Sequence, residues 1–240
     1  MANAIQYNKS LSGIWIVIPA YNEETTIRPI LQELCANDYS VIVVDDCSKD
    51  ATSQIAMDYP VVVLRHLVNL GQGAALQTGF DYINRYSDVK CAVTFDSDGQ
   101  HSITDIQKVI KPVLSGEYEV VLGSRFIESR FADLKKNGMP LLKYLTLKMG
   151  ILFTRLTTRL NVTDTHNGLR AFSGKALKTI RITQNRMAHG SEILSQIARA
   201  KLSYCEAPVN ISYTEYSKKK GQSIFNSINI LWDLLTGRDE

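Results

Sequence analysis

Short apolar runs alternate with segments of helical spacing along the first half of the chain. The runs, rich in β-branched residues as buried strands are, occupy residues 13–18, 41–44, 61–64, 91–95 and 119–122. Apolar residues recur with the period of an amphipathic helix at residues 23–37, 73–86 and 104–114. Pro19 is expected to end the first strand, and Asp50 to cap a short helix that runs through Met57.

This alternation predicts the fold class. Parallel strands joined by helical crossovers give an α/β domain with a mostly parallel, Rossmann-like sheet flanked by helices. In such sheets ligands bind beyond the carboxyl ends of the strands. Polar clusters stand at three of these ends, at residues 21–23, 45–46 and 96–98. The sequence therefore predicts one site, built from three acidic strand ends on a single rim.

The second half of the chain has a different pattern, and a mixed C-terminal part is expected. The segment 139–160 is apolar, which suits core helices or a membrane interface. Its interspersed basic residues are Lys143, Lys148, Arg155 and Arg159. Beyond it, the pattern predicts a strand within 201–213, a basic loop at 217–223 and an amphipathic helix at 224–235.

The composition is that of an ordinary globular chain. Of the 240 residues, 45% are hydrophobic and 21% are charged, which excludes a disordered chain, a collagen, a small disulfide scaffold and a coiled coil. The length suits one domain spanning 1–240. The net charge of +3 and the pI near 8.6 are too mild to indicate a nucleic-acid partner, and none is expected.

Cysteines and apolar stretches bear on the cellular location. The four cysteines form no CxxC pair, so neither a zinc site nor a disulfide framework is expected, and a reducing cytosol fits best. No stretch approaches the roughly 18–20 apolar residues of a spanning helix. The first apolar run, 14–20, follows polar residues rather than the charged segment of a targeting signal. The chain is expected to be cytoplasmic, or peripheral on the cytoplasmic face of a membrane.

The sharpest chemical signal is Asp96-x-Asp98-x-Gln100. Two carboxylates at the mouth of a buried strand repel each other unless a cation lies between them. Mg²⁺ and Mn²⁺ prefer oxygen ligands and are often held by one or two carboxylates plus substrate phosphates. The Gln100 carbonyl oxygen adds a third candidate ligand. The plain alternative is an Asx turn with solvated acids.

Other polar positions carry weaker signals. A carboxylate of Asp45 or Asp46 is suited to accept from a nucleotide base or a ribose hydroxyl, although a turn with a helix cap explains part of this pattern. The glycines Gly71 and Gly73 precede a helix, where backbone N–H groups can approach an anion, but a tight loop is the simpler explanation. Arg125 follows the fifth strand and suits phosphate oxygens, although lone surface arginines without a ligand are common.

Basic and titratable residues of the second half remain ambiguous by themselves. The run Lys218–Lys220, with Gly221 and Ser223, suits a loop that closes over phosphates, but a solvated charge run is the commoner case. His189 and Glu192 stand at the start of a predicted helix. Glu192 is suited to act as a base, or it is simply a favourable negative charge in the first helical turn. His101 and His166 show no metal-ligand spacing.

Taken together, these segments resemble the family 2 glycosyltransferases, most closely their polyprenyl-phosphate (dolichol-phosphate) sugar transferase branch. The resemblance runs from about residue 13 to 223, and six motifs in the family's order make it specific. The matching motifs are VIPAYNE (17–23), VVDDCSKDAT (43–52), NLGQG (69–73), DSDGQH (96–101), GSR (123–125) and DTHNGLRAF (164–172).

The resemblance implies a GT-A fold, a UDP- or GDP-linked sugar donor and a divalent metal, Mg²⁺ or Mn²⁺. Residues 13–125 would form the nucleotide-sugar half. The residues implied to bind the donor are Pro19, Ala20, Tyr21, Glu23, Asp45, Asp46, Gly73, Asp96, Ser97, Asp98, Arg125, Lys218 and Ser223. Among them Asp96 and Asp98 match the DxD pair of metal ligands, and Gln100 matches a third metal-side position.

The acceptor side is implied to lie in residues 126–223. Arg125 and Lys143 would hold an acceptor phosphate, and Lys218 stands where an arginine is usual. The implied reaction is a single inverting displacement at the anomeric carbon. A phosphate-monoester acceptor, whose second pKa is about 6, needs little general-base help. A sugar hydroxyl needs a base, and Asp164 and Glu192 are then the candidates.

The membrane spans usual in the family have no counterpart in the sequence. The helix at 224–235, within a C-terminal segment 224–240, is expected to act as a surface anchor, or a separate membrane protein to receive the product.

Rival functions fit less well. The main alternative is a family 2 enzyme that extends a saccharide, against which Gln100 and the 139–160 segment argue. Residues 93–99 resemble the nucleophile motif of haloacid-dehalogenase phosphatases, but that motif normally opens its domain. A receiver-type signalling domain is disfavoured because Lys111 follows Asp96 too closely. A nucleotidyltransferase is disfavoured because no Gly-rich loop with Arg and Lys follows the first strand.

Overall fold

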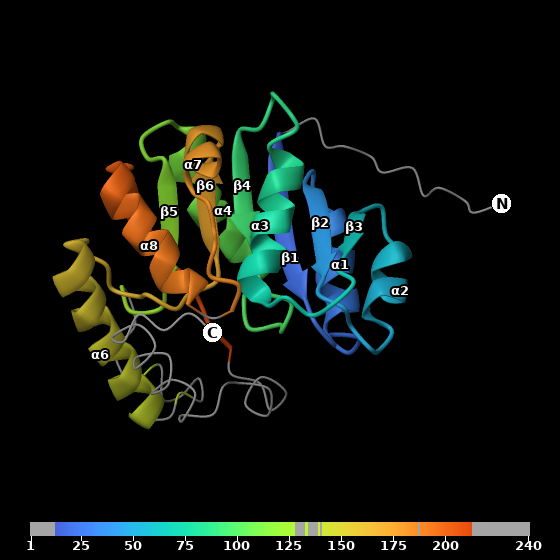
Figure 1. The fold of residues 1–240 in the computed structure, drawn as a ribbon, viewed down its shortest axis with the longest axis horizontal. Helices are drawn as coiled ribbons and strands as arrows, with labels where there is room; N and C mark the ends of the chain where they lie inside the picture. Colours follow the sequence, from blue (N-terminus) through green and yellow to red (C-terminus); the bar gives the residue numbers. More distant parts are fainter. Residues whose placement is uncertain (1–12, 128–132, 134–138, 140, 187, 213–240) are drawn as a thin grey trace.

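A computed structural model describes residues 13–127, 133, 139, 141–186 and 188–212. A seven-stranded sheet forms its centre, in the order β3-β2-β1-β4-β6-β5-β7 (Figure 1). The strands are β1 (Ile14–Ala20), β2 (Ser40–Asp45), β3 (Val62–Arg65), β4 (Cys91–Thr94), β5 (Val120–Ser124), β6 (Arg170–Ser173) and β7 (Tyr204–Pro208). All pairings are parallel except those of β6, which runs antiparallel to both β4 and β5. The predicted α/β class with a mixed C-terminal part is confirmed.

Helices cover both faces of the sheet because strand side chains alternate between the faces. On one face Ile16 and Val43 pack with α1 (Ile27–Cys35), α2 (Thr52–Met57) and α4 (Ile106–Leu114). On the other face Trp15 and Ile42 pack with α3 (Gln72–Ile83), α7 (Gly174–Thr179) and α8 (His189–Ala200). Both faces of the central strands are therefore buried, which explains their continuous apolar runs.

The predicted helices of the first half are present with shifted ends. Residues 23–26 form a turn rather than helix, in which the Glu23 carbonyl accepts from the backbone N–H groups of Thr26 and Ile27. A 3₁₀ turn, η1 (Ile103–Asp105), precedes α4 where one helix was expected from residue 104. The short helix ends at Met57 as predicted, but its N-cap is Ala51 rather than Asp50; the Asp50 carboxylate lies one residue earlier and accepts from the Thr52 backbone N–H at 3.0 Å.

Two details of the strand predictions are wrong. Pro19 does not end β1, which continues to Ala20. Pairing with β4 stops at Val17, so the missing N–H of Pro19 interrupts no ladder on that side. Strand β6 was not predicted, because its four residues include a charged and a polar end. Pairing with a neighbour on each side makes it a strand.

The segment 139–160 forms one long helix, α6 (Leu141–Thr158), which contacts α8. Figure 1 shows it extending past the lower edge of the sheet, where the parallel strands end. Its buried side includes Leu147, which packs with Met139, Phe126 and Tyr144. Within the described residues, no helix is long and apolar enough to cross a membrane. The expected helix at 224–235 lies outside the described residues, and the division into two halves stays a prediction.

Candidate active site

The carboxyl ends of β1, β2 and β4 are neighbours in the sheet, so the three acidic clusters that follow them share one rim. Strand β5 ends on the same rim and delivers Arg125. Because β6 is antiparallel, it begins there, and the segment 164–169 before it faces the acids. Helices α3 and α8 also begin at this edge (Figure 1).

Asp96 lies at the centre of the rim with its side chain 26% exposed. Its Oδ1 accepts from Gln72 Nε2 at 2.8 Å, and its Oδ2 lies 3.4 Å from His101 Nε2. Burial alone raises the pKa of Asp96, but the hydrogen bond and charge of His101, with the charges of His189 and Arg170, hold it below its usual value. Asp96 is therefore held ionised.

Asp98 has the opposite shift. Burial, followed by the charge of Asp96 and a smaller contribution from Glu23, raises the pKa of Asp98 to about 6. Its two oxygens accept from the Gln100 backbone N–H at 3.0 Å and from Gln100 Nε2 at 2.6 Å. The pair thus carries an unfavourable concentration of negative charge, which a cation would relieve.

The residues present fit a Mg²⁺ or Mn²⁺ ion that completes its shell with phosphate and water oxygens. Among the described residues, no group of three or more His, Cys, Asp or Glu side chains is arranged to hold a metal alone. Asp96 and Asp98 supply two hard oxygen ligands, and a half-turn of the Gln100 amide replaces its nitrogen by its oxygen beside Asp98.

Gly168 fixes the position of Asp96, and sequence reasoning did not single it out. A Cβ atom at Gly168 would lie 2.0 Å from Asp96 Oδ2. The Gly168 carbonyl accepts from Thr94 Oγ1 at 2.6 Å, which ties this turn to the end of β4. Only a glycine leaves room for the carboxylate, and its place inside the 164–172 motif was the available signal.

Arg125 and Asp164 form a buried ion pair, with side chains 6% and 0% exposed. Arg125 Nε donates to Asp164 Oδ2 at 2.6 Å, and Arg125 Nη2 donates to the His166 carbonyl at 3.2 Å. The other oxygen of Asp164 accepts from the His166 backbone N–H. Asp164 therefore orients Arg125 at the end of β5, and its carboxylate is engaged by its own chain.

Arg170 is a second buried cation that sequence reasoning missed. Its guanidinium donates to the carbonyls of Thr165, Asn167 and Gly190. Burial lowers its pKa to about 10, against the raising effect of the Asp164 and Asp96 charges. Two cationic side chains, Arg125 and Arg170, thus lie among the acidic side chains Asp164 and Asp96, and the charge of Arg170 contributes to the lowered pKa of Asp96.

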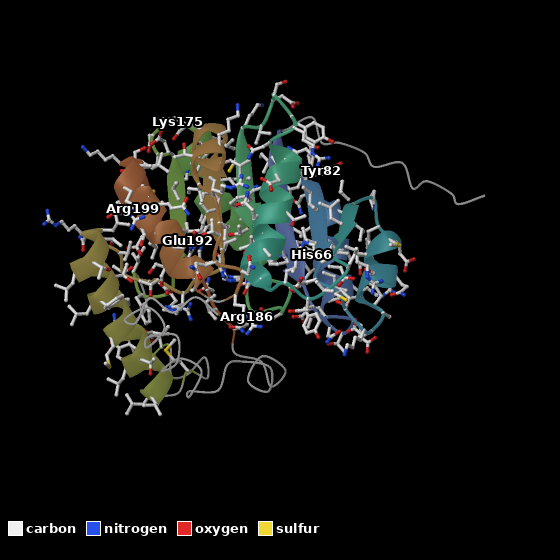
Figure 2. The ribbon with its side chains drawn as sticks, viewed as in Figure 1. His66, Tyr82, Lys175, Arg186, Glu192 and Arg199 are labelled. Atoms are coloured by element: carbon white, nitrogen blue, oxygen red, sulfur yellow. The ribbon has the colours of Figure 1, made fainter. Side chains whose placement is uncertain are left out.

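The two aspartates after β2 hold loops. Asp45 is fully buried and accepts from Ser53 Oγ and from the Ser48 backbone N–H at 2.9 Å. Asp46 accepts from the Leu70 and Gly71 backbone N–H groups at 2.8 and 2.7 Å. It also lies 2.7 Å from His66 Nδ1, on the β3–α3 connection (Figure 2). These contacts hold a turn in place. A turn was the alternative to ligand binding that the sequence pattern left open for Asp45 and Asp46.

Other residues implied in donor binding lie on the same rim. Tyr21 is 37% exposed after β1, whereas Glu23 is buried. The Pro19 carbonyl accepts from Ser97 Oγ at 2.8 Å, and the Ala20 carbonyl accepts from the Asp46 backbone N–H, so these contacts join β1 to its two neighbours.

Gly73 and Glu192 meet around the segment 183–185. The Gly73 backbone N–H donates to the Asn185 carbonyl at 2.8 Å, and a Cβ at Gly73 would lie 2.0 Å from the Gln184 carbonyl oxygen. Glu192 accepts from the backbone N–H groups of Thr183 and Gln184. Figure 2 shows Glu192 on α8 and Arg186 just before that helix. Both Gly73 and Glu192 thus support the packing of α3 against this segment.

Three implied residues stay predictions without a described side chain. Lys218 and Ser223 lie outside the described residues. Lys143 lies in α6, but its side chain also lies outside the description.

Comparisons with known proteins agree with this geometry. The sequence model of glycosyl transferase family 2 matches residues 15–181. An uncharacterised protein of Methanocaldococcus jannaschii is 39% identical, over 92% of this chain and 90% of its own. The UDP-N-acetylglucosamine–dolichyl-phosphate N-acetylglucosaminyltransferase of Methanococcus voltae is 35% identical, over 92% of this chain and 94% of its own.

Solved structures support the fold. Glucosyl-3-phosphoglycerate synthase of Mycobacterium tuberculosis, crystallised with Mn²⁺, UDP-glucose and phosphoglyceric acid, superposes with a TM-score of 0.64. The match covers 92% of this chain and 78% of that one at 19% identity. This likeness shows the GT-A fold. Together with the family match it leaves no place for the phosphatase, receiver and nucleotidyltransferase alternatives. The chain belongs to glycosyl transferase family 2.

Proposed function

We propose that this glycosyltransferase moves a sugar from a uridine diphosphate donor to a polyprenyl phosphate, with inversion and with a divalent metal. The observation that carries the proposal is the Asp96–Asp98 pair on the rim beside the buried Arg125–Asp164 ion pair. The relative from Methanococcus voltae, named for a UDP-sugar donor and a dolichyl-phosphate acceptor, supports the choice of both substrates.

The metal would be held by Asp96, Asp98 and the Gln100 amide oxygen. When bound, Mg²⁺ or Mn²⁺ offsets the negative charge that grows on the leaving diphosphate. The chain itself keeps Asp96 ionised through His101 and Arg170, and confines it against Gly168. The solved neighbours that hold Mn²⁺ or Mg²⁺ with UDP support this assignment.

The donor would lie across the ends of β1 and β2. Tyr21 is the exposed aromatic side chain there and is suited to contact the base, while Pro19, Ala20, Glu23 and Ser97 shape the floor. Asp45 and Asp46 would act mainly through the loops that they hold, since their oxygens accept from their own chain. Lys218 and Ser223 would close over the diphosphate.

The hydrogen bonds already made by the two candidate bases favour a phosphate acceptor over a sugar hydroxyl. Asp164 is committed to Arg125, and Glu192 is committed to residues 183 and 184. These contacts argue against either carboxylate as the base for a sugar hydroxyl. A largely dianionic phosphate needs no such base and can displace the diphosphate in one inverting step. Arg125, with Lys143, would bind that phosphate.

An acceptor of this kind lies in a membrane. We place the enzyme peripherally on the cytoplasmic face of that membrane, alone or beside a membrane protein that receives its product. The exposed apolar side of α6, with Lys148 and Arg155 along it, supports this location.

The test is transfer from a panel of UDP- and GDP-sugars, with Mn²⁺ or Mg²⁺, to dolichyl or undecaprenyl phosphate or to a saccharide. We expect metal-dependent transfer from one UDP-sugar to the lipid phosphate, with inverted configuration by NMR of the product. Transfer to saccharides alone would overturn the acceptor assignment and return Asp164 and Glu192 to the role of base.

A further inference from the structure

Large apolar side chains that face solvent are unevenly distributed in the described residues. Met57 and Leu114, at the ends of α2 and α4, lie on the edge where the parallel strands begin. The others follow the carboxyl ends of strands or lie on α6: Tyr21, Leu67, Val68, Leu70, Ile127, Leu141, Leu142, Leu145, Met149, Leu152 and Leu156. The edge that carries the active site is thus also the apolar edge.

The loop after β3 is the unexpected part of this set. Leu67 is 97% exposed and Val68 is 59% exposed. The loop is nevertheless firmly built, because the buried Asp46 carboxylate accepts from the backbone N–H groups of Leu70 and Gly71. Asn69 Nδ2 also donates to the Asp46 carbonyl. A loop held this well and still turned outward with its apolar tip is suited to enter an apolar phase.

Neither apolar segment contains an acidic residue of its own, although Arg65 pairs with the buried Asp45 carboxylate at 3.3 Å and keeps its side chain 47% exposed. Residues 65–72 contain Arg65 and no acid, and residues 141–160 contain four basic residues and no acid. Helix α6 begins beside Phe126, directly after β5, so it flanks the site on the side opposite the β3–α3 loop (Figure 1). Apolar groups with neighbouring cations match the interface of an anionic bilayer.

We propose that the Leu67–Leu70 loop is a second membrane contact, which together with α6 holds the active-site rim against an anionic lipid bilayer. The inference rests on the proposed function, since it gives a membrane-borne acceptor phosphate a short path to Arg125. Two membrane contacts on opposite sides of the rim fix the orientation of the enzyme on the bilayer. A single helix lying on the bilayer surface would still allow the protein to rotate about the helix axis.

The experiment compares three double variants of the full chain with the wild type: L67S/V68S in the loop, L152S/L156S on α6, and M57S/L114S on the far edge as a matched control. Co-sedimentation uses vesicles of phosphatidylcholine with and without phosphatidylglycerol. We expect loop and α6 variants to bind the anionic vesicles about tenfold more weakly or worse, given the apolar area removed, and the control to bind as the wild type does.

The UDP affinity, measured by calorimetry, tests whether the loop contacts the membrane or instead forms part of the nucleotide site. We expect it to be unchanged in L67S/V68S. Weaker UDP binding with undiminished vesicle binding would make the loop part of the nucleotide site and overturn the proposal. The proposal would also be overturned if the wild type is a dimer, the loop variant is a monomer, and vesicle binding is undiminished. The loop would then be a self-association surface.

Transfer assays distinguish this proposal from the proposed function. L67S/V68S should keep transfer to a short water-soluble prenyl phosphate and lose it to a long-chain acceptor in vesicles. If the wild type transfers to no prenyl phosphate, the proposed function fails, while vesicle binding still decides the role of the loop. Wild-type indifference to anionic vesicles overturns the membrane contact by itself.

Discussion

The acidic rim and helix α6 differ in whether the side chains that they present have partners within the chain. On the rim nearly every polar group that the sequence pointed to is engaged by its own chain, as Asp46 and Asp164 are. On α6 the apolar residues of one side, including Leu152 and Leu156, face solvent. The rim is pre-organised for a polar, charged ligand, and α6 is suited to an apolar surface. This difference fits the proposed transfer of a sugar from a nucleotide donor to a lipid phosphate.

The largest expected effect comes from removing the charge of the rim. Asp98→Asn should lower transfer by about 10²–10³-fold or more, because the metal loses a ligand and the leaving diphosphate loses its counter-charge. The melting temperature should not fall, since burial and Asp96 already disfavour the Asp98 carboxylate. Near-wild-type turnover would show that the rim does not hold the metal.

Gly168→Ala should disable the same site without touching a charge. The new Cβ would lie 2.0 Å from Asp96 Oδ2 and must displace that carboxylate. We expect Mn²⁺ binding, measured by electron paramagnetic resonance, to weaken about tenfold or more as one ligand moves. Gly150→Ala on α6 is the matched control, because its nearest neighbour is the His166 side chain at 3.3 Å. Equal Mn²⁺ affinity in both variants would contradict the role of Gly168.

Breaking the buried Arg125–Asp164 ion pair should mainly lower the free energy of unfolding. Asp164→Asn leaves the Arg125 guanidinium without its carboxylate in a buried place, at a cost of about 3–5 kcal/mol of unfolding free energy. Urea unfolding checks this. Asp58→Asn is the control, since its pair with Arg28 is exposed and should contribute less than about 1 kcal/mol. A small loss at Asp164 would mean that Arg125 is turned to solvent in the folded protein.

The smallest effect is the pH dependence of metal binding. The native pKa of Asp98 is about 6, above its usual value, so protons compete with the metal below that pH. Mn²⁺ affinity should be constant above pH 7 and fall by up to about tenfold per pH unit below 6. The stability of the metal-free protein should change in the opposite sense, falling as the pH rises toward 6, because the folded state binds the Asp98 proton more tightly. Calorimetry in Asp98→Asn should show neither trend.

Much of the rim could be predicted from the sequence, because strand ends and acidic pairs are local features. The position of Asp96, Asp98 and Arg125 at strand ends on one edge was predicted in this way. Gly168 and Arg170 were not, since what matters in them is a distance to residues far along the chain. The candidate bases show the same limit. Glu192 and Asp164 are plausible by type, but only their partners show that their oxygens are engaged.

The sequence by itself determined the α/β class, the family and the edge on which the site lies, because periodicity and strand-end chemistry are written in short segments. The tertiary structure alone decided that β6 inserts antiparallel between β4 and β5 and so brings Asp164 and Gly168 to the acids. It also decided which apolar residues stay uncovered. Leu67 and Ile16 are alike as hydrophobic residues, and burial depends on what packs against each from distant parts of the chain.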